Sequence, residues 1–156
     1  MHPNAERVQQ ALKALGVECQ VLELPESTHS AADAAKAIGT SLAKIVKTLV
    51  FQSHQQPVLV LASGTNRVSL PKLRKLLGEA SRADADAVKR FTGFPIGGVA
   101  PVGLGQPMTV LIDADLSGEE QLWVAAGTPH AVFCCSASEL AQLSGGRFEE
   151  IKEDAK

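Results

Sequence analysis

The segment Ile45–Phe51 constrains the fold more strongly than any other part of the chain. If it forms a β-strand, its odd-numbered and even-numbered residues face opposite sides, because side chains alternate along a strand. Both sets are apolar apart from Lys47 and Thr48. A strand that is apolar on both faces is typical of the centre of a covered sheet. The sequence therefore predicts a domain built around this strand.

The other predicted elements mix strands and helices without the regular alternation of a doubly wound sheet. Further strands are predicted at residues 17–24, 57–62, 108–112, 122–126 and 131–135, with a terminal strand or tail at 147–151. Helices are predicted at 5–15, 31–37, 70–77, 84–91 and 137–143, with a further turn at 42–44. A chain of 156 residues with 45% hydrophobic content suits one domain. We expect an α/β (α+β) fold over residues 1–156, with a mixed, curved or barrel-like sheet surrounded by helices.

The formal net charge of -2 hides an uneven distribution of charge along the chain. Residues 34–78 carry seven basic and no acidic side chains, whereas residues 113–156 carry three basic and nine acidic ones. The overall balance excludes a histone-like polycation. The basic segment is either a site for an anionic partner or a solvated face that pairs with the acidic C-terminal third.

Cysteine usage and hydropathy both favour a cytoplasmic protein. Cys19, Cys134 and Cys135 lack metal-ligand spacing, and cysteines adjacent in sequence are poorly placed to bridge each other. Free thiols are the simplest interpretation, and they fit a reducing compartment. The N-terminus lacks the apolar core of a signal peptide, and no apolar run approaches the roughly 20 residues that span a membrane.

Lys47 is the residue with the clearest chemical implication. A lysine on a central strand must reach a cavity or an edge, or it loses its hydration. Beside an open pocket, its ammonium is suited to bind phosphate or polarise a carbonyl. The alternative is that Lys47 has no functional role: its aliphatic stem packs against apolar neighbours near the start of the strand, and its ammonium reaches solvent.

A glycine- and proline-rich loop at Gly93–Gly105 is the second candidate feature. Its adjacent Gly97 and Gly98 let the backbone approach a ligand closely, and Pro101 restricts the outline of the loop.

His130, at a loop-to-strand junction, and Asp113, at a strand end, can each serve a site or only a turn. His29 is expected at the start of a helix. The sequence lacks a P-loop, a dinucleotide fingerprint, a Gly-x-Ser-x-Gly elbow and a Cys/His metal cluster.

Five segments in order resemble the YbaK/prolyl-tRNA-synthetase-associated domain family: Lys47–Phe51, Val58–Leu61, Gly97–Pro101, Leu111–Asp113 and Ala126–His130. The resemblance extends from about Ala5 to Ile151. It implies a free-standing deacylase that hydrolyses the ester of mischarged aminoacyl-tRNA, with a barrel-like mixed sheet, no metal or other cofactor, and no covalent nucleophile. The attacking water is then oriented by backbone groups and by a ribose hydroxyl of the substrate.

The resemblance also implies roles for particular residues. Lys47 matches the functional lysine that holds the 3'-terminal adenosine or its phosphate. The loop Gly97, Gly98, Val99, Ala100 and Pro101 matches the loop that positions the aminoacyl group, and Gly127, Thr128, His130 and Asp113 are further candidates for contact with the substrate. A set of basic residues is expected to meet tRNA phosphates, namely Lys44, Arg67, Lys72, Arg74 and Lys75.

The identity of the amino acid is less constrained. Thr48 after the lysine is typical of cysteine-type and broader small-side-chain members, whereas Thr128–His130 resembles members that act on alanine and slightly larger aliphatic analogues. We expect tRNA for proline carrying alanine or a similar small amino acid as the substrate, prolyl-tRNA synthetase as a candidate partner, and a monomer or weak dimer. The alternatives are a cysteine-type deacylase, a non-catalytic module that binds tRNA or a synthetase, and a sensor of amino acids or nucleotides.

Overall fold

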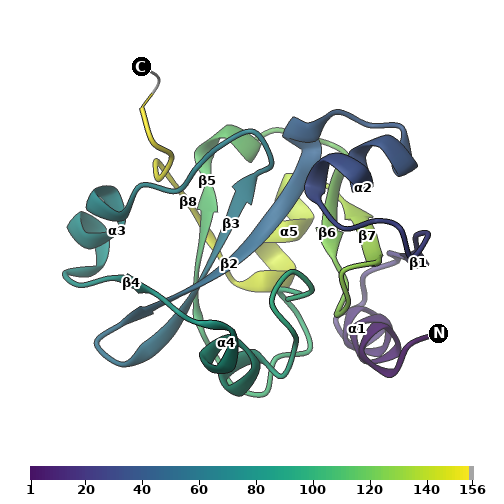
Figure 1. Cartoon of the computed structure of the whole chain (residues 1–156), viewed down its shortest axis with the longest axis horizontal. Helices are drawn as coiled ribbons and strands as arrows, with labels where there is room; N and C mark the ends of the chain where they lie inside the picture. The colour runs from purple at the N-terminus through teal and green to yellow at the C-terminus, as the bar shows by residue number, and fades with distance from the viewer. Residues whose placement is uncertain (155–156) are drawn as a thin grey trace.

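The computed structural model describes residues 1–154 and contains one mixed eight-stranded sheet with helices packed around it (Figure 1). The strands are β1 (Val21–Glu23), β2 (Ile45–Ser53), β3 (Gln56–Ser63), β4 (Ser81–Arg82), β5 (Thr109–Asp113), β6 (Leu122–Ala125), β7 (Ala131–Cys135) and β8 (Arg147–Glu149). The helices are α1 (Pro3–Ala14), α2 (Ala31–Ile38), α3 (Leu70–Leu77), α4 (Ala85–Thr92) and α5 (Ala137–Ser144), with single 3-10 turns η1 (Leu42–Lys44) and η2 (Ala114–Leu116).

The order of the strands is β1-β7-β6-β2-β3-β5-β8, and β4 pairs with β2 beside this path. The long β2–β3 hairpin lies at its centre, with β6 parallel to β2 and β5 parallel to β3. This mixture of parallel and antiparallel pairs confirms the predicted α/β architecture and the central position of the Ile45–Phe51 segment.

Short polar side chains begin the helices as the sequence predicted. Ser30, Ser69 and Asp84 each accept a hydrogen bond from a backbone N–H in the first turn of α2, α3 and α4. Ser136 forms a reciprocal capping box with Glu139 at the start of α5. These local contacts satisfy N–H groups that the helix itself leaves free, so they set the helix boundaries before any packing is considered.

The two faces of β2 pack against different helices. On the even-numbered face, Val46 and Val50 join the main core, to which α1, α4 and α5 contribute. On the odd-numbered face, Ile45 packs with α2, and Phe51 packs with Leu73 of α3. Lys47 therefore lies between two separate apolar clusters on its own face of the strand.

The main differences from the sequence-based prediction of the sheet concern β1, β4 and the C-terminal segment. β1 covers only residues 21–23, because an edge strand keeps only the stretch that pairs with β7. β4 was not predicted, since two polar residues carry no periodic signal, and it exists only through pairing with the end of β2. The C-terminal segment is a strand only up to Glu149. Beyond it, the buried Ile151 belongs to no strand, and its backbone carbonyl accepts a hydrogen bond from Ser69 N.

Candidate active site

The edge of β2 that faces away from β3 is open in its middle. β6 pairs with Ile45 and Val46, and β4 pairs with Phe51 and Gln52. Within the described chain, no strand is paired with the stretch between them on this side. The carbonyl of Val50 points to this side, because it accepts a hydrogen bond from Ala83 N. Since backbone groups alternate in direction along a strand, the N–H and C=O of Thr48 point into the same gap.

A pocket of about 380 Å³ opens at this gap. Its walls come from segments far apart in sequence: the start of α2, the middle of β2, the segment around Arg82, the glycine-rich loop and the β6–β7 turn. The lining is mostly apolar, with the ammonium of Lys47 and the guanidinium of Arg82 among its few charged groups. This composition suits a ligand that has a small apolar part and an anionic part.

Lys47 is half-buried in the pocket wall, and its Nζ donates a hydrogen bond of 2.5 Å to the backbone carbonyl of Asn66. Burial lowers the pKa of Lys47 below its ordinary value, and the nearby charges of Arg67 and Arg82 lower it further. The charge of Asp113 acts in the opposite direction. A desolvated ammonium beside two guanidinium groups forms a strongly positive site for an anion or a polarised oxygen.

The repulsion between Arg82 and Lys47 leads to a testable pH effect. In the variant Arg82→Gln, the pKa of Lys47 is expected to rise, because a neighbouring positive charge disfavours the ammonium form. Lys47 then keeps its charge to a higher pH. A ¹³C NMR titration of the lysine Cε resonances measures this shift. Arg90→Gln is the control, since Arg90 is also exposed and lies over a phenylalanine ring; identical Lys47 titrations in the two variants would contradict the prediction.

The glycine-rich loop contributes Ile96, Gly97 and Val99 to the pocket wall. Gly98 is buried and does not line the pocket; instead its Cα lies so close to the backbone of Thr128 that an added Cβ would stand 2.8 Å from Thr128 Cα. Ala100 and Pro101 are also buried, and Pro101 lines a separate shallow groove. The first half of the loop thus lines the pocket, and the second half is buried in the fold and holds the loop in place.

Arg7 on α1 fixes the back of this loop. Its guanidinium donates hydrogen bonds to the carbonyls of Thr92 and Gly103 and lies 4.5 Å from the ring centroid of Phe94. These contacts join the two ends of the loop to one side chain. The loop is therefore a shaped part of the fold, as its glycine and proline content predicts.

The β6–β7 turn forms the opposite wall. Pro129 lines the pocket, whereas Thr128 is buried and its hydroxyl accepts a hydrogen bond from His130 N. Gly127 packs against α1, and its carbonyl accepts a hydrogen bond from the side chain of Asn4. The ring of His130 lies edge-on to that of His29, with centroids 6.1 Å apart, and His29 lines the pocket at the start of α2.

The predicted basic residues do not form one uniform surface. Arg67 and Lys75 are exposed, and Lys44 is partly exposed. Lys72 is 2.8 Å from a carboxylate oxygen of Asp154 and 3.8 Å from one of Glu150, so it pairs with the acidic C-terminal segment. Arg74 donates to the carbonyl of Ala80. Pairing with the acidic C-terminal segment is therefore confirmed for Lys72, whereas contact of Arg67 and Lys75 with an anionic partner stays a prediction.

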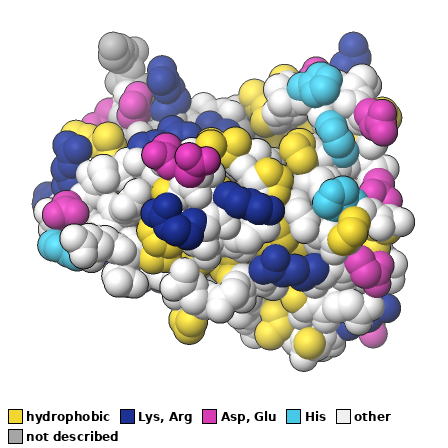
Figure 2. All heavy atoms as spheres, turned by 60° about the horizontal axis from the view of Figure 1, so that its bottom comes forward, with side chains coloured by type: hydrophobic (Ala, Val, Ile, Leu, Met, Phe, Trp, Pro, Cys, Tyr) yellow, Lys and Arg dark blue, Asp and Glu magenta, His cyan; other side chains and the backbone are white. Residues whose placement is uncertain are grey.

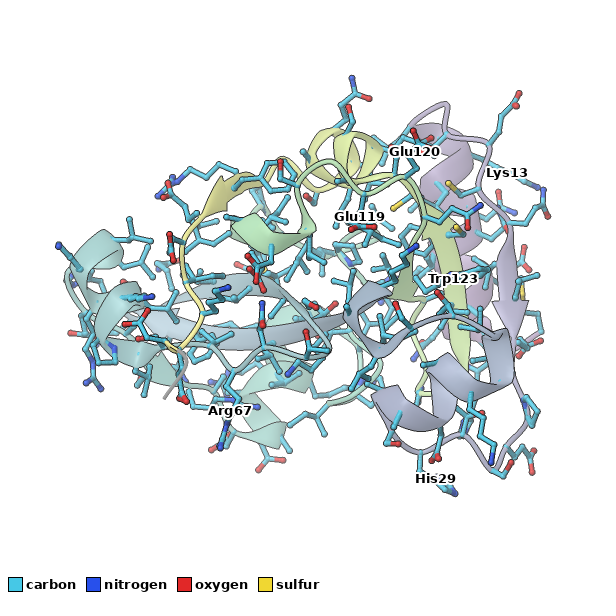
Figure 3. All side chains as sticks on the ribbon, turned by 90° about the horizontal axis from the view of Figure 1, so that it is seen from above. Lys13, His29, Arg67, Glu119, Glu120 and Trp123 are labelled. Carbon is cyan, nitrogen blue, oxygen red and sulfur yellow. The ribbon has the colours of Figure 1, made fainter. Side chains whose placement is uncertain are left out.

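Two views show how charge is distributed over the surface. In Figure 2, Lys and Arg side chains gather in the middle of one face, beside apolar and acidic side chains, and most of the visible His side chains lie to one side. In Figure 3, Arg67 and His29 lie along one edge of the molecule, while Glu119 and Glu120 lie toward the other. Basic side chains thus cluster on one face, and acidic side chains also lie beside them there.

Asp113 lies apart from the pocket. It is buried, at 1% exposure, and does not line the pocket, contrary to its predicted contact with the substrate. Pocket residues that were not singled out from the sequence as site residues include Thr48, Arg82, Trp123 and His29. The hydroxyl Oγ1 of Thr48 is buried without a hydrogen-bond partner in the described chain. Arg82, Trp123 and His29 belong to no motif, and they come together at the pocket only through the fold.

A sequence profile of the aminoacyl-tRNA editing domain matches residues 25–143, which include every wall of this pocket. The chain belongs to the aminoacyl-tRNA editing domain family. A crystal structure described as a candidate trans-editing enzyme for prolyl tRNA synthetase is 42% identical, with a TM-score of 0.96 and coverage of 99% of both chains.

Two relatives of this editing domain illustrate how it occurs in other proteins. The uncharacterised protein YwhH of Bacillus subtilis is 31% identical over 81% of this chain and 82% of its own length. A proline–tRNA ligase of Maridesulfovibrio salexigens is 33% identical over 90% of this chain, which spans only 24% of the ligase. The editing domain thus resembles a part of prolyl-tRNA synthetases as well as a protein of its own size.

The described residues add three further findings about this editing domain. No helix within residues 1–154 is both long and apolar enough to cross a membrane. Over the same residues, no three His, Cys, Asp or Glu side chains come together in a group that could hold a metal ion. Burial raises the pKa of the Cys135 thiol, and also that of Cys19 and Cys134, so these thiols are weak nucleophiles.

Proposed function

We propose that this chain is a trans-editing deacylase that hydrolyses the ester of tRNA for proline mischarged with alanine or a similar small amino acid. The observation that carries the proposal is the position of Lys47 at the open edge of β2, in a pocket with a positive side and mostly apolar walls. The positive side suits the phosphate and ribose oxygens of a terminal nucleotide. The apolar walls suit a small apolar side chain.

The reaction needs little from the protein beyond positioning. Water adds to the carbonyl carbon of the aminoacyl ester, and the ribose oxygen then leaves and takes up a proton, which releases the amino acid and intact tRNA. Two basic side chains line the pocket, those of Lys47 and Arg82, and no Asp or Glu of the described chain lines it. A cation that stabilises the developing oxyanion, together with backbone groups of β2 and the glycine-rich loop, is sufficient for an already activated ester.

A panel of mischarged tRNAs tests the proposal. We expect tRNA for proline carrying alanine or 2-aminobutyrate to be hydrolysed fastest, and the same tRNA carrying proline to be spared. Selectivity between side chains that differ by one methylene is expected to be limited, since such a difference is worth about 1–3 kcal/mol in an apolar pocket. Preference for the cysteine-charged tRNA would instead assign a cysteine-type deacylase.

The same panel separates catalysis from binding. Absence of hydrolysis of every mischarged species at micromolar protein would contradict the deacylase. If tRNA then binds saturably and less tightly as salt rises, the chain is a tRNA-binding module. Because charged tRNA is made and used in the cytoplasm, we place the activity there, acting alone or beside prolyl-tRNA synthetase.

A further inference from the structure

Asp113 is a buried carboxylate that the pocket does not use directly. Its Oδ2 accepts hydrogen bonds from Ser63 N at 3.1 Å and from the side-chain nitrogen of Asn66 at 2.8 Å. Its Oδ1 accepts from Asp115 N at 3.0 Å. A buried carboxylate is unfavourable unless such donors surround it. The three donors lie at the end of β3, in the loop after it and in the turn after β5, so Asp113 joins these segments.

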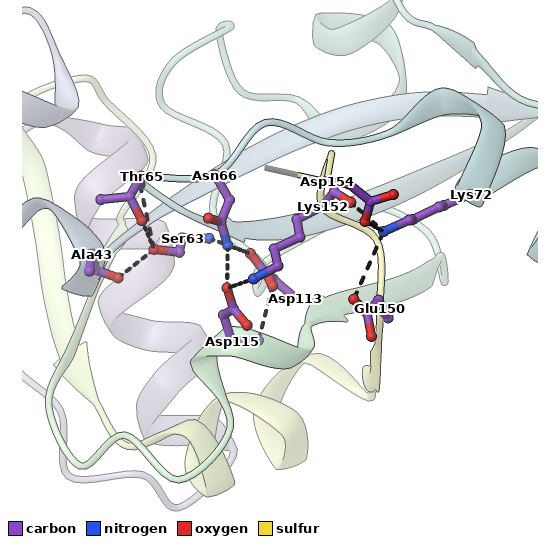
Figure 4. A network of polar contacts seen from close by, with 10 residues as sticks. All are labelled: Ala43, Ser63, Thr65, Asn66, Lys72, Asp113, Asp115, Glu150, Lys152 and Asp154. Atoms are coloured by element: carbon purple, nitrogen blue, oxygen red, sulfur yellow. Dashed lines mark hydrogen bonds and ion pairs between the residues drawn. The ribbon is translucent and has the colours of Figure 1, made fainter. Parts of the chain in front are cut away.

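The loop that Asp113 holds also carries the partner of Lys47. The side chain of Asn66 donates to Asp113, while the backbone carbonyl of the same residue accepts from Lys47 Nζ (Figure 4 shows the Asp113 side of this chain of contacts). A lysine ammonium has three N–H donors. The contact with Asn66 uses one of them and limits the rotation of the others, which leaves two to act at the pocket.

We propose that Asp113 is a positioning residue for Lys47, acting through Asn66. By fixing the loop from Ser63 to Asn66, it sets where the Asn66 carbonyl holds the ammonium at the mouth of the pocket. The inference rests on the proposed catalytic role of Lys47. The negative charge of Asp113 adds a second effect, because it raises the pKa of Lys47 against the opposing effects of burial, Arg67 and Arg82.

A neighbouring carboxylate provides a matched control. Asp115 also accepts a hydrogen bond from the Asn66 side chain, at 2.9 Å, and pairs with Lys152 at 2.7 Å (Figure 4). It differs from Asp113 in being exposed to solvent. Exposed pairs of this kind contribute little, because water competes for both partners. Asp115→Asn therefore removes a charge at the same loop without removing the buried support.

The test compares Asp113→Asn and Asp115→Asn in the full chain by two measurements. In Asp113→Asn we expect kcat/KM for the mischarged tRNA to fall by about 10- to 100-fold, the scale of a misplaced catalytic group. We also expect Lys47 to titrate at a lower pH than in the parent chain, as read from its Cε resonance. In Asp115→Asn we expect both quantities to stay close to those of the parent. Unchanged kcat/KM and unchanged Lys47 titration in folded Asp113→Asn would overturn the proposal.

A second variant covers the case in which Asp113→Asn does not fold. Asn66→Ala cuts the side-chain link to Asp113 but keeps the carbonyl and the buried charge, and it is expected to lower kcat/KM in the same direction. Full activity in Asn66→Ala would overturn the positioning role. The Lys47 titration needs no substrate, so it tests the electrostatic effect of Asp113 on Lys47 even if the chain hydrolyses no mischarged tRNA. That outcome would contradict the proposed function alone.

Discussion

Replacement of Lys47 by methionine is expected to lower the rate of deacylation by at least about tenfold, the scale of removing one electrostatic contact to a transition state. Methionine keeps the length and the apolar character of the lysine stem, so packing between Ile45 and Leu49 is retained. The change removes a half-buried charge that burial disfavours, as the lowered pKa of Lys47 indicates. The thermal unfolding midpoint is therefore expected to stay the same or to rise.

The measurement pairs kcat/KM on mischarged tRNA with thermal unfolding of the same preparations. Lys13→Met is the control, because Lys13 lies in α1, is exposed and does not line the pocket. Near-parental activity in Lys47→Met would remove Lys47 from the site. Loss of activity together with a large loss of stability would show that the side chain acts through folding instead of chemistry.

Replacement of Gly98 by alanine is expected to reduce deacylation about tenfold or more and to destabilise the fold by about 1–3 kcal/mol, as overpacking of a close contact does. The added Cβ would lie 2.8 and 2.9 Å from two backbone atoms of Thr128, which have no side-chain freedom to move away. The loop and the β6–β7 turn must therefore separate. Because Gly97, Val99 and Pro129 line the pocket from these two segments, the separation changes the pocket itself.

Gly105→Ala is the matched control for this prediction. Gly105 is in the same glycine-rich segment, but a Cβ there meets nothing within 4 Å. Kinetics on the tRNA panel and denaturant unfolding are compared for the two variants. Equal behaviour of Gly98→Ala and Gly105→Ala would show that the contact with Thr128 does not shape the site.

Much of the fold follows from local patterns. The alternation along Ile45–Phe51 identified the central strand, and short polar caps such as Ser30 and Ser136 identified helix starts. These patterns are reliable because the backbone groups that they satisfy lie within a few residues of the side chain concerned. β4 escaped prediction because a two-residue strand depends entirely on its distant partner.

The candidate site was predictable in part. A lysine on an apolar strand needs a cavity or an edge, and Lys47 has both. The role of Gly98 could not be inferred, since its neighbour Thr128 is thirty positions away in the sequence and becomes adjacent only through folding. Asp113 was recognised as a strand-end carboxylate, but its direction, away from the pocket and toward Asn66, depends on how the loop after β3 folds back.

The sequence shows how the charged residues are distributed along the chain, but it does not show how they are arranged in space. The sequence predicted either a site for an anionic partner or pairing with the acidic C-terminal third. The fold pairs Lys72 with Asp154 and leaves Arg67 exposed near Lys47, where contact with an anionic partner stays a prediction.

By itself, then, the sequence determined the central strand, the helix starts, the shaped glycine-rich loop and the lysine that needs a cavity, because each depends on neighbours along the chain. Only the tertiary structure decided that β6 and β4 leave the edge of β2 open between them, and that Arg82, Trp123 and His29 meet Lys47 there. Those features depend on strand pairing and packing between distant segments, and such contacts leave no periodic signal in the sequence.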